Sequence, residues 1–226
     1  LLVGLATQLT PALAADVVFG YLPTWQTDKA EGVDMTKYTH ITIAFAIPDE
    51  NGQITMDNRD GMMKDTLVVR VIHAGIPASK INAGLPFYGR TVTANGDMTN
   101  PRDMYQPLSK TIPHGDGDDK EESDISCGGP KLFSGIWKYT NLRGEGVLDA
   151  PDSASAPWVR HYDNATNTPW LFNKDTKDFI SYDDMTSISA KAEYVAEKGL
   201  AGVMVWPITN DYENELVNAV LVAFNN

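Results

Sequence analysis

The side chains best suited to holding a ligand stand at the ends of short apolar runs. Trp206 ends the run at residues 201–206, and Tyr88 and Arg90 directly follow the run at residues 81–87. A guanidinium is a planar fork of donors suited to hydroxyl and carbonyl oxygens, and an aromatic ring offers a flat apolar face. These side chains can position a ligand, but they supply no acid. Two more aromatic residues end the N-terminal apolar runs in the same way, Tyr21 and Phe45.

Carboxylates are dense in one place, residues 116–122, which read Asp-Gly-Asp-Asp-Lys-Glu-Glu. This stretch follows no apolar strand and has no Gly at the sixth position of a calcium loop, so a solvated acidic loop is expected. The four histidines show no metal-ligand spacing, and no Ser-His-Asp or phosphate-loop pattern is present. The sequence therefore predicts neither a metal nor an organic cofactor. The histidines are His40, His73, His114 and His161.

Five separated motifs follow one another along the chain. They are Val-Phe-Gly-Tyr at 18–21, Tyr-Thr-His-Ile-Thr-Ile-Ala-Phe-Ala at 38–46, Lys-Ile-Asn-Ala-Gly-Leu-Pro-Phe-Tyr-Gly-Arg at 80–90, Phe-Ile-Ser-Tyr-Asp-Asp at 179–184 and Gly-Val-Met-Val-Trp-Pro at 202–207, with Asp211 after the last. In this order the chain resembles the family 18 glycoside hydrolases, the chitinases. The resemblance covers nearly the whole chain after residue 15, so coincidence is improbable.

This resemblance implies an α/β fold, a TIM (β/α)8 barrel with an α+β insertion after strand 7. It implies endo-type hydrolysis of β-1,4-linked N-acetylglucosamine without a cofactor. The family's general acid is the Glu of a D-x-x-D-x-D-x-E motif on strand 4, which protonates the glycosidic oxygen while the substrate's N-acetyl oxygen attacks. That motif is nowhere in the 226 residues. We therefore expect no catalytic residue and no measurable chitinase activity from this chain.

By the same resemblance, five residues are expected to bind the sugar. Trp206 would form the floor under the sugar where cleavage occurs, and Tyr88 and Arg90 would line the groove. Tyr21 and Phe45 would lie beneath the sugar at the mouth ends of strands 1 and 2. Core packing is the open alternative for Trp206, Tyr21 and Phe45. For Arg90 and Tyr88 the alternative is a pairing with an Asp and packing inside.

Three further expectations concern residues near this groove. The Trp206–Pro207 bond is expected to be cis, since a proline lowers the cost of the cis form to about 0.5–1 kcal/mol. Tyr-Asp-Asp at 182–184 is expected to be structural. Five aromatic residues of the middle region are expected in a core rather than in a groove wall, namely Tyr105, Trp137, Tyr139, Trp158 and Trp170.

Apolar patterning indicates strands and helices in alternation, which is typical of parallel pairing. Runs rich in Val, Ile, Phe and Thr predict strands, and apolar spacings of three and four predict helices. A region rich in Gly, Pro, Asp and Asn is too long for a simple loop and indicates an inserted subdomain. The expected strands are residues 16–22, 39–47, 81–87 and 201–206, and the expected helices are 62–74, 187–198 and 213–224.

The chain is expected to hold part of a barrel. Residues 1–14 read as a partial signal peptide with small residues at the cleavage site, although a buried first helix or strand is the alternative. Residues 15–90 and 179–226 would form the incomplete barrel, and residues 91–178 the insertion. Strands 1, 2, 7 and 8 have counterparts and strands 3 to 6 have none. What remains is about half of the roughly 250 residues of a full barrel.

Strands 7-8-1-2 are one contiguous half of a closed barrel, so they could form an open parallel sheet. Its exposed edges would favour self-association, and a dimer of two halves closing one barrel is one outcome. A non-catalytic, lectin-like chitin-binding protein and an inert remnant are the other two readings.

Composition narrows the class of protein and its partners. The chain is 42% hydrophobic and 21% charged, as in globular proteins. Its net charge of -12 argues against nucleic acid and anionic membranes as partners, and no run reaches the roughly 20 apolar residues of a membrane span. The single cysteine, Cys127, cannot form an intrachain disulfide. We expect a secreted, extracellular protein that binds chitin or N-acetylglucosamine oligosaccharides.

Overall fold

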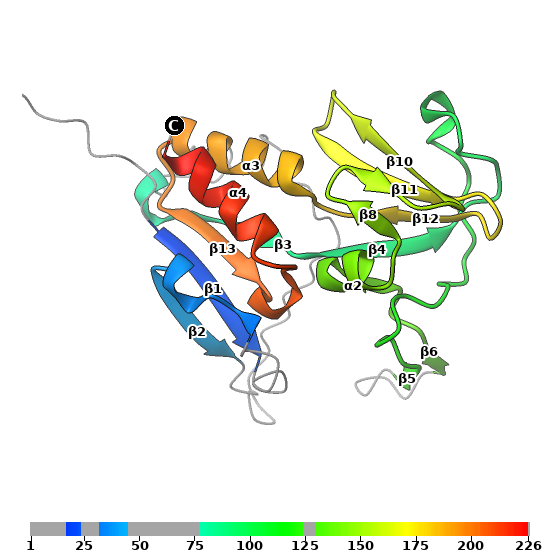
Figure 1. Ribbon diagram of the computed structural model, residues 1–226, viewed down its shortest axis with the longest axis horizontal. Helices are drawn as coiled ribbons and strands as arrows, with labels where there is room; N and C mark the ends of the chain where they lie inside the picture. Colours follow the sequence, from blue (N-terminus) through cyan, green and yellow to red (C-terminus); the bar gives the residue numbers. More distant parts are fainter. Residues whose placement is uncertain (1–16, 24–31, 45–76, 124–129, 226) are drawn as a thin grey trace, which may run out of the picture.

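Figure 1 shows the computed structural model, which describes residues 17–23, 32–44, 77–123 and 130–225. Its two larger sheets are one parallel and one antiparallel sheet. The described elements are β1 (Val17–Pro23), η2 (Met35–Lys37), β2 (His40–Ala44), η3 (Ala78–Lys80), β3 (Asn82–Pro86), β4 (Tyr88–Thr93), η4 (Pro101–Asp103), β5 (Glu122–Ser123), β6 (Lys131–Leu132), β7 (Ile136–Lys138), α2 (Tyr139–Gly144), β8 (Leu148–Ala150), β9 (Ser153–Ala154), β10 (Trp158–Asp163), β11 (Thr168–Asn173), β12 (Asp178–Ser181), α3 (Met185–Glu197), β13 (Gly202–Trp206), η5 (Ile208–Asn210) and α4 (Glu215–Phe224).

The parallel sheet has four strands in the order β2-β1-β13-β3. All three pairings are parallel. The runs expected to form an open parallel sheet, residues 39–47, 16–22, 201–206 and 81–87, supply these four strands in that order. The expected helix at residues 62–74 and the last three residues of the expected strand at 39–47 lie outside the described residues.

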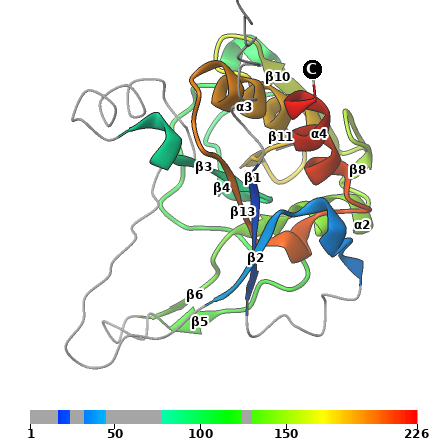
Figure 2. The same ribbon diagram turned by 90° about the vertical axis from the view of Figure 1, so that its left-hand side faces the viewer.

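Helices α3 and α4 pack together on one side of this sheet, as Figure 2 shows. They cover its buried face, where the side chains are aliphatic and nearly inaccessible. Helix α3 begins at Asp184, whose side chain accepts hydrogen bonds from the backbone N–H groups of Thr186 and Ser187 in a capping box. It ends at Glu197 and is followed by Gly199, whose φ of +60° is the left-handed conformation that favours glycine. The buried strand residues are Val18, Ala83, Leu85, Val203 and Val205.

The antiparallel sheet has five strands in the order β10-β11-β12-β4-β7. The β10–β11 hairpin pairs over six residues on each strand, and β12 returns the chain alongside β4. Two small two-stranded pairs and helix α2 complete this part. The middle region is thus built mostly of β-hairpins. Their strands are short and are interrupted by turns rich in Gly and Asp, so hydrophobic periodicity did not predict them.

Phe87 is the residue at which the chain passes from one sheet to the other. It stands alone between β3 and β4 and its side chain is fully buried. Its N–H donates to the carbonyl of Trp206 (2.9 Å), and its carbonyl accepts from the N–H of Tyr139 (3.1 Å). One residue therefore fixes the antiparallel sheet to the end of β13.

The aromatic residues of the middle region divide between core and surface. Tyr139 and Trp170 are buried, as the core interpretation expected. Trp137 and Trp158 are half-buried and meet edge-on, with ring centroids 6.1 Å apart. Tyr105 is 82% exposed, so for this residue the core expectation was wrong. The reason is local, because Tyr105 follows the short η4 turn and no strand or helix brings it inward.

Candidate functional site

Tyr21 and Trp206 lie together on the parallel sheet. Their ring centroids are 5.7 Å apart with an interplanar angle of 63°, an edge-to-face contact. Both side chains are half-buried. Trp206 is the last residue of β13, and Tyr21 lies two residues before the end of β1. The two rings therefore stand toward the carboxyl ends of neighbouring parallel strands.

The strand register brings these rings together. Gly20 is paired with Val205, so the next residue on each strand is Tyr21 and Trp206. Gly20 is tightly packed on its own side of the sheet, where a Cβ atom would come within 2.6 Å of Ile208 and 2.8 Å of Tyr38. A side chain at position 20 would push β1 away and disturb the register that aligns Tyr21 with Trp206.

Tyr88 and Arg90 form a second pair, on β4 of the antiparallel sheet. Arg90 is exposed and Tyr88 half-buried. The guanidinium carbon of Arg90 is 6.0 Å from the Tyr88 ring centroid, at the outer limit of a cation–π contact. Within the described part of the chain no ion pair joins Arg90 to an Asp. The described contacts thus place Tyr88 and Arg90 beside each other, one and three residues beyond the junction at Phe87.

Phe45, the fifth residue expected at the groove, lies outside the described residues. Phe87 was missed as a positioning residue by the sequence analysis. The sequence feature that could have identified Phe87 is the unbroken apolar run Leu-Pro-Phe-Tyr at residues 85–88. In this run the alternation of buried and partly exposed side chains continues from β3 into β4.

The expected cis bond between Trp206 and Pro207 is absent. Among the described residues the cis bond is Ala156–Pro157. The carbonyl of Trp206 is held by the N–H of Phe87, and Pro207 continues in an extended conformation (φ -87°, ψ 156°) before η5. The backbone therefore leaves β13 in line with the strand, which the ordinary trans bond allows.

The acidic stretch at residues 116–122 is not the freely solvated loop that was expected. Asp116 is only 1% exposed, and its carboxylate accepts from the backbone N–H groups of Asp118 (3.0 Å) and Lys138 (2.8 Å). Asp119 accepts from Gly115, Ser134 and Gly135, and these bonds hold its pKa below the ordinary value although burial opposes them. Buried backbone donors need acceptors, so these two carboxylates turn inward and shape the loop.

Asp211 is the one carboxyl group of the described residues whose pKa is raised, to about 6. Burial is the main cause, and hydrogen bonds from backbone N–H groups oppose it. Its two oxygens accept from Leu216 (2.9 Å) and Val217 (3.0 Å) in the first turn of α4. A raised pKa is what a general acid needs, but both oxygens of Asp211 are used to cap a helix. The described geometry gives it a structural role.

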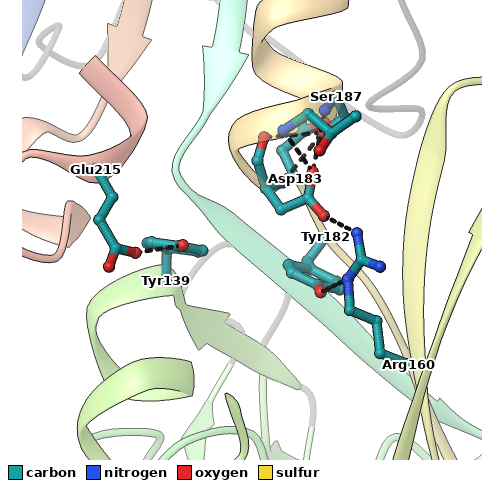
Figure 3. A network of polar contacts seen from close by, with 8 residues as sticks. Tyr139, Arg160, Tyr182, Asp183, Ser187 and Glu215 are labelled. Carbon is teal, nitrogen blue, oxygen red and sulfur yellow. Dashed lines mark hydrogen bonds and ion pairs between the residues drawn. The ribbon is translucent and has the colours of Figure 1, made fainter. Parts of the chain in front are cut away.

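The Tyr-Asp-Asp segment at residues 182–184 is structural, as expected. Arg160 of β10 pairs with Asp184. It also donates to the Tyr182 hydroxyl at 3.2 Å, as Figure 3 shows. Asp183 accepts from Lys191 and from the hydroxyl of Ser187 (2.7 Å). These bonds join the antiparallel sheet to the start of α3.

Neither a metal centre nor a membrane-spanning element is found in the described parts of the chain. No three His, Cys, Asp or Glu side chains among those residues gather as metal ligands would. None of the described helices combines the length and apolar character that crossing a bilayer requires.

Comparison with known proteins points to one family. The chain is 34% identical over 163 residues to the chitinase ChiA of Flavobacterium johnsoniae, a match over 65% of this chain and 10% of that protein. It is 34% identical over 157 residues to a chitinase-like effector of Moniliophthora roreri, over 66% of this chain and 38% of that protein. It is 26% identical to chitinase A1 of Niallia circulans, over 86% of this chain and 23% of that protein. This chain therefore spans well under half of each of these relatives.

Solved structures of chitinases are also similar to this chain. The chitinase of Rhizomucor miehei superposes with a TM-score of 0.63 at 32% identity, over 69% of this chain and 42% of that one. A class V chitinase from Nicotiana tobaccum, in complex with NAG4, shows the same fold with a TM-score of 0.52 at 20% identity, over 70% of this chain and 38% of that one. The sequence pattern described as Glycosyl hydrolases family 18 matches residues 60–211, and the chain belongs to that family.

Proposed function

We propose that this chain is a chitinase-like member of family 18 that holds N-acetylglucosamine polymers and does not cleave them. The observation that carries the binding half of this proposal is the Tyr21–Trp206 pair (5.7 Å) on the parallel sheet. In TIM barrels the functional residues lie at the carboxyl ends of the parallel strands. Two half-buried rings at that place offer flat apolar surface to a sugar ring.

The absence of cleavage is inferred from the sequence. A raised-pKa carboxylic acid is the indispensable group in the family's substrate-assisted reaction, and no D-x-x-D-x-D-x-E motif occurs in the chain. Asp211 has a raised pKa, but both of its oxygens accept backbone hydrogen bonds from α4. Asp211 is therefore not placed to take over the proton transfer.

The proposal includes an arrangement of parts. Residues 15–90 and 179–226 would be the incomplete barrel, with β1, β2, β3 and β13 as family strands 1, 2, 7 and 8. Residues 91–178 would be the insertion, and residues 1–14 part of a signal peptide for secretion. The parallel order β2-β1-β13-β3 and the antiparallel sheet between β3 and β13 support a division of this kind, although the antiparallel sheet itself runs from Tyr88 of β4 to Ser181 of β12.

Arg90 and Tyr88 extend the proposed groove. A guanidinium that is exposed and not engaged by a described carboxylate is free to donate to sugar hydroxyl or acetamide oxygens. In this proposal Arg90 and Tyr88 contact the polymer on the far side of Phe87, and Phe45 contributes from the end of β2. The NAG4 complex of the Nicotiana tobaccum chitinase supports the same class of ligand.

Binding to chitin beads tests the proposal. The unchanged chain should be retained, and Trp206→Ala should weaken retention roughly tenfold, since aromatic contacts contribute about 0.5–1.5 kcal/mol beyond the area they bury. Tyr105→Ala is the matched control, because that ring is 82% exposed and far from the pair in sequence and fold. Circular dichroism must show that both variants are folded.

Two results would count against the proposal. Equal retention of the unchanged chain and Trp206→Ala would remove the role of the aromatic pair. No retention of the unchanged chain would favour the inert remnant over the lectin-like protein.

A further inference from the structure

The two faces of the parallel sheet are unequal. One face is buried beneath α3 and α4 (Figure 2). The other presents Phe19, Tyr21, Met204 and Trp206 as half-buried side chains, and Asn82 and Gly84 as exposed positions. Parallel sheets occur almost only with both faces covered. The described elements cover one face of the sheet. The second face is largely apolar, and we expect it to be covered as well.

The two edges of the same sheet are also open among the described strands. β2 and β3 are its outermost strands, and each is five residues long. The N–H of Phe87 points to β13, so the alternation of a strand turns the N–H groups of Gly84 and Asn82 outward. The N–H of Thr39 points to Val18 on β1, which turns those of His40 and Thr42 outward. Each edge thus offers a row of backbone donors and acceptors.

The two open edges fit each other. Both strands run in the same direction, because all pairings of the sheet are parallel. A twofold axis along the strands would set β2 of one copy beside β3 of a second copy, in parallel, twice. Four strands and four strands make the eight of a closed (β/α) barrel, and closure removes every edge.

The distribution of charge also makes the open face the place where a second copy of this chain can bind. The chain carries a net charge of -12, which would oppose association through most of its surface. The side chains of Phe19, Tyr21, Asn82, Met204 and Trp206 on the open face carry no carboxylate, so this face can meet a copy of itself without burying two negative charges. The ring of His40 stacks on Phe19, with centroids 4.5 Å apart, and extends the surface of stacked rings toward the β2 edge.

We propose that two copies of this chain close one eight-stranded barrel, in which β2 of each copy pairs with β3 of the other. The interior of that barrel is the Phe19, Tyr21, Met204 and Trp206 face of both copies. A twofold axis parallel to the strands brings both Tyr21–Trp206 pairs to the same rim. This deepens the proposed function, on which it rests for the strand count, since it supplies the missing half of the sugar site.

Sedimentation equilibrium of the full 226-residue chain tests the association without any sugar. The expected result is a closed dimer with twice the 24.8 kDa chain mass and no larger species. A profile that stays monomeric to high micromolar concentration would overturn the proposal. So would open-ended growth, because edges that pair without closing produce ladders rather than dimers. Failure of chitin binding would leave this result unchanged, so the two proposals are tested separately.

A matched pair of variants at Gly84 tests the edge. Gly84→Pro removes the outward N–H of β3, a change that edge strands tolerate, and should weaken dimerisation at least about tenfold. Gly84→Ala keeps the N–H and adds a Cβ that meets only Met204, at an ordinary 3.4 Å, and should dimerise like the unchanged chain. Equal dimerisation of the two variants would contradict pairing through β3.

A second pair tests the face, in case Gly84→Pro does not fold. Met204→Glu places a charge on a face that water reaches in the monomer and that the dimer buries. It should therefore yield a folded monomer, and Met204→Leu should remain a dimer. A Met204→Glu chain that dimerises as strongly as Met204→Leu would overturn the proposal.

Discussion

The hydroxyl of Tyr139 donates a hydrogen bond of 2.6 Å to a carboxylate oxygen of Glu215 (Figure 3). Tyr139 is the first residue of α2, beside the antiparallel sheet, and Glu215 is the first residue of α4, on the parallel one. Arg143 pairs with the other oxygen of Glu215 at 3.1 Å and donates to the carbonyl of Leu148. This network ties together two parts of the molecule that lie 76 residues apart in sequence.

Replacing Tyr139 with Phe removes that tie and keeps the ring. Tyr139 is fully buried, and burial together with Glu215 raises the pKa of its hydroxyl, so the group is a neutral donor at every ordinary pH. Loss of a buried hydrogen bond to a charged acceptor should lower the free energy of unfolding by about 1–3 kcal/mol. Urea unfolding followed by circular dichroism measures this. Tyr105→Phe, at an exposed position, should stay within about 0.5 kcal/mol, and equal midpoints for both variants would contradict the prediction.

Asp184 is expected to stabilise the start of α3 in two separable ways. It caps the helix through Thr186 and Ser187, and it pairs with Arg160, whose side chain is 14% exposed. Asp184→Ala removes both contributions and should cost about 3–5 kcal/mol, the range for breaking a buried pair. Asp184→Asn loses the charge but keeps a good N-cap, so it should recover about 0.5–2 kcal/mol of that loss. Chemical unfolding of the two variants compares them, and identical stabilities would show that the cap contributes nothing.

Asp211 should make the protein less stable as pH rises. Its pKa in the folded state is raised to about 6 from an ordinary value of 3.8. Between these values the folded state keeps a proton that the unfolded chain releases, so the free energy of unfolding falls as pH increases through this window. A shift of this size corresponds to about 3 kcal/mol, lost between pH 4 and pH 7.

The measurement compares the unchanged chain with Asp211→Asn, which cannot titrate. Urea unfolding at pH 4 and pH 7 gives the stability difference between the two proteins at each pH. That difference should move against the unchanged chain by up to about 3 kcal/mol on going to pH 7. A difference that does not change with pH, or that moves the other way, would refute the prediction.

Incubation with a soluble N-acetylglucosamine oligomer should release no reducing ends. The reason is the missing acid motif, because the acetamide oxygen cannot displace a leaving group that receives no proton. Any release must be checked with Asp211→Asn, since Asp211 is the described carboxyl group with a raised pKa. Hydrolysis by the unchanged chain that is abolished in this variant would show that the family's acid has been replaced.

Much of the parallel sheet could be predicted from local sequence. The apolar runs at residues 16–22, 81–87 and 201–206 correspond to β1, β3 and β13 within one or two residues. Each is a short buried strand, and a strand of a parallel sheet is recognisable from its continuous apolar run alone. Helices α3 and α4 were likewise visible, because their apolar faces repeat at helical spacing. The order of the four parallel strands was predicted from the resemblance, because the corresponding strands are neighbours in the family's barrel.

The sequence by itself also determined the family and the absence of the acid motif, since both depend only on which residues follow one another. Tertiary structure decided the rest. The sequence predicted that Asp116 and Asp119 lie in a solvated acidic loop. Only the fold shows that their carboxylates accept hydrogen bonds from the backbone N–H groups of Lys138 and Gly135. The trans bond before Pro207 is seen only in the structure, and the hydrogen bond between Tyr139 and Glu215 joins segments that periodicity cannot relate. Local patterns report burial and period, whereas hydrogen-bond partners distant in sequence are chosen when the sheets and helices pack.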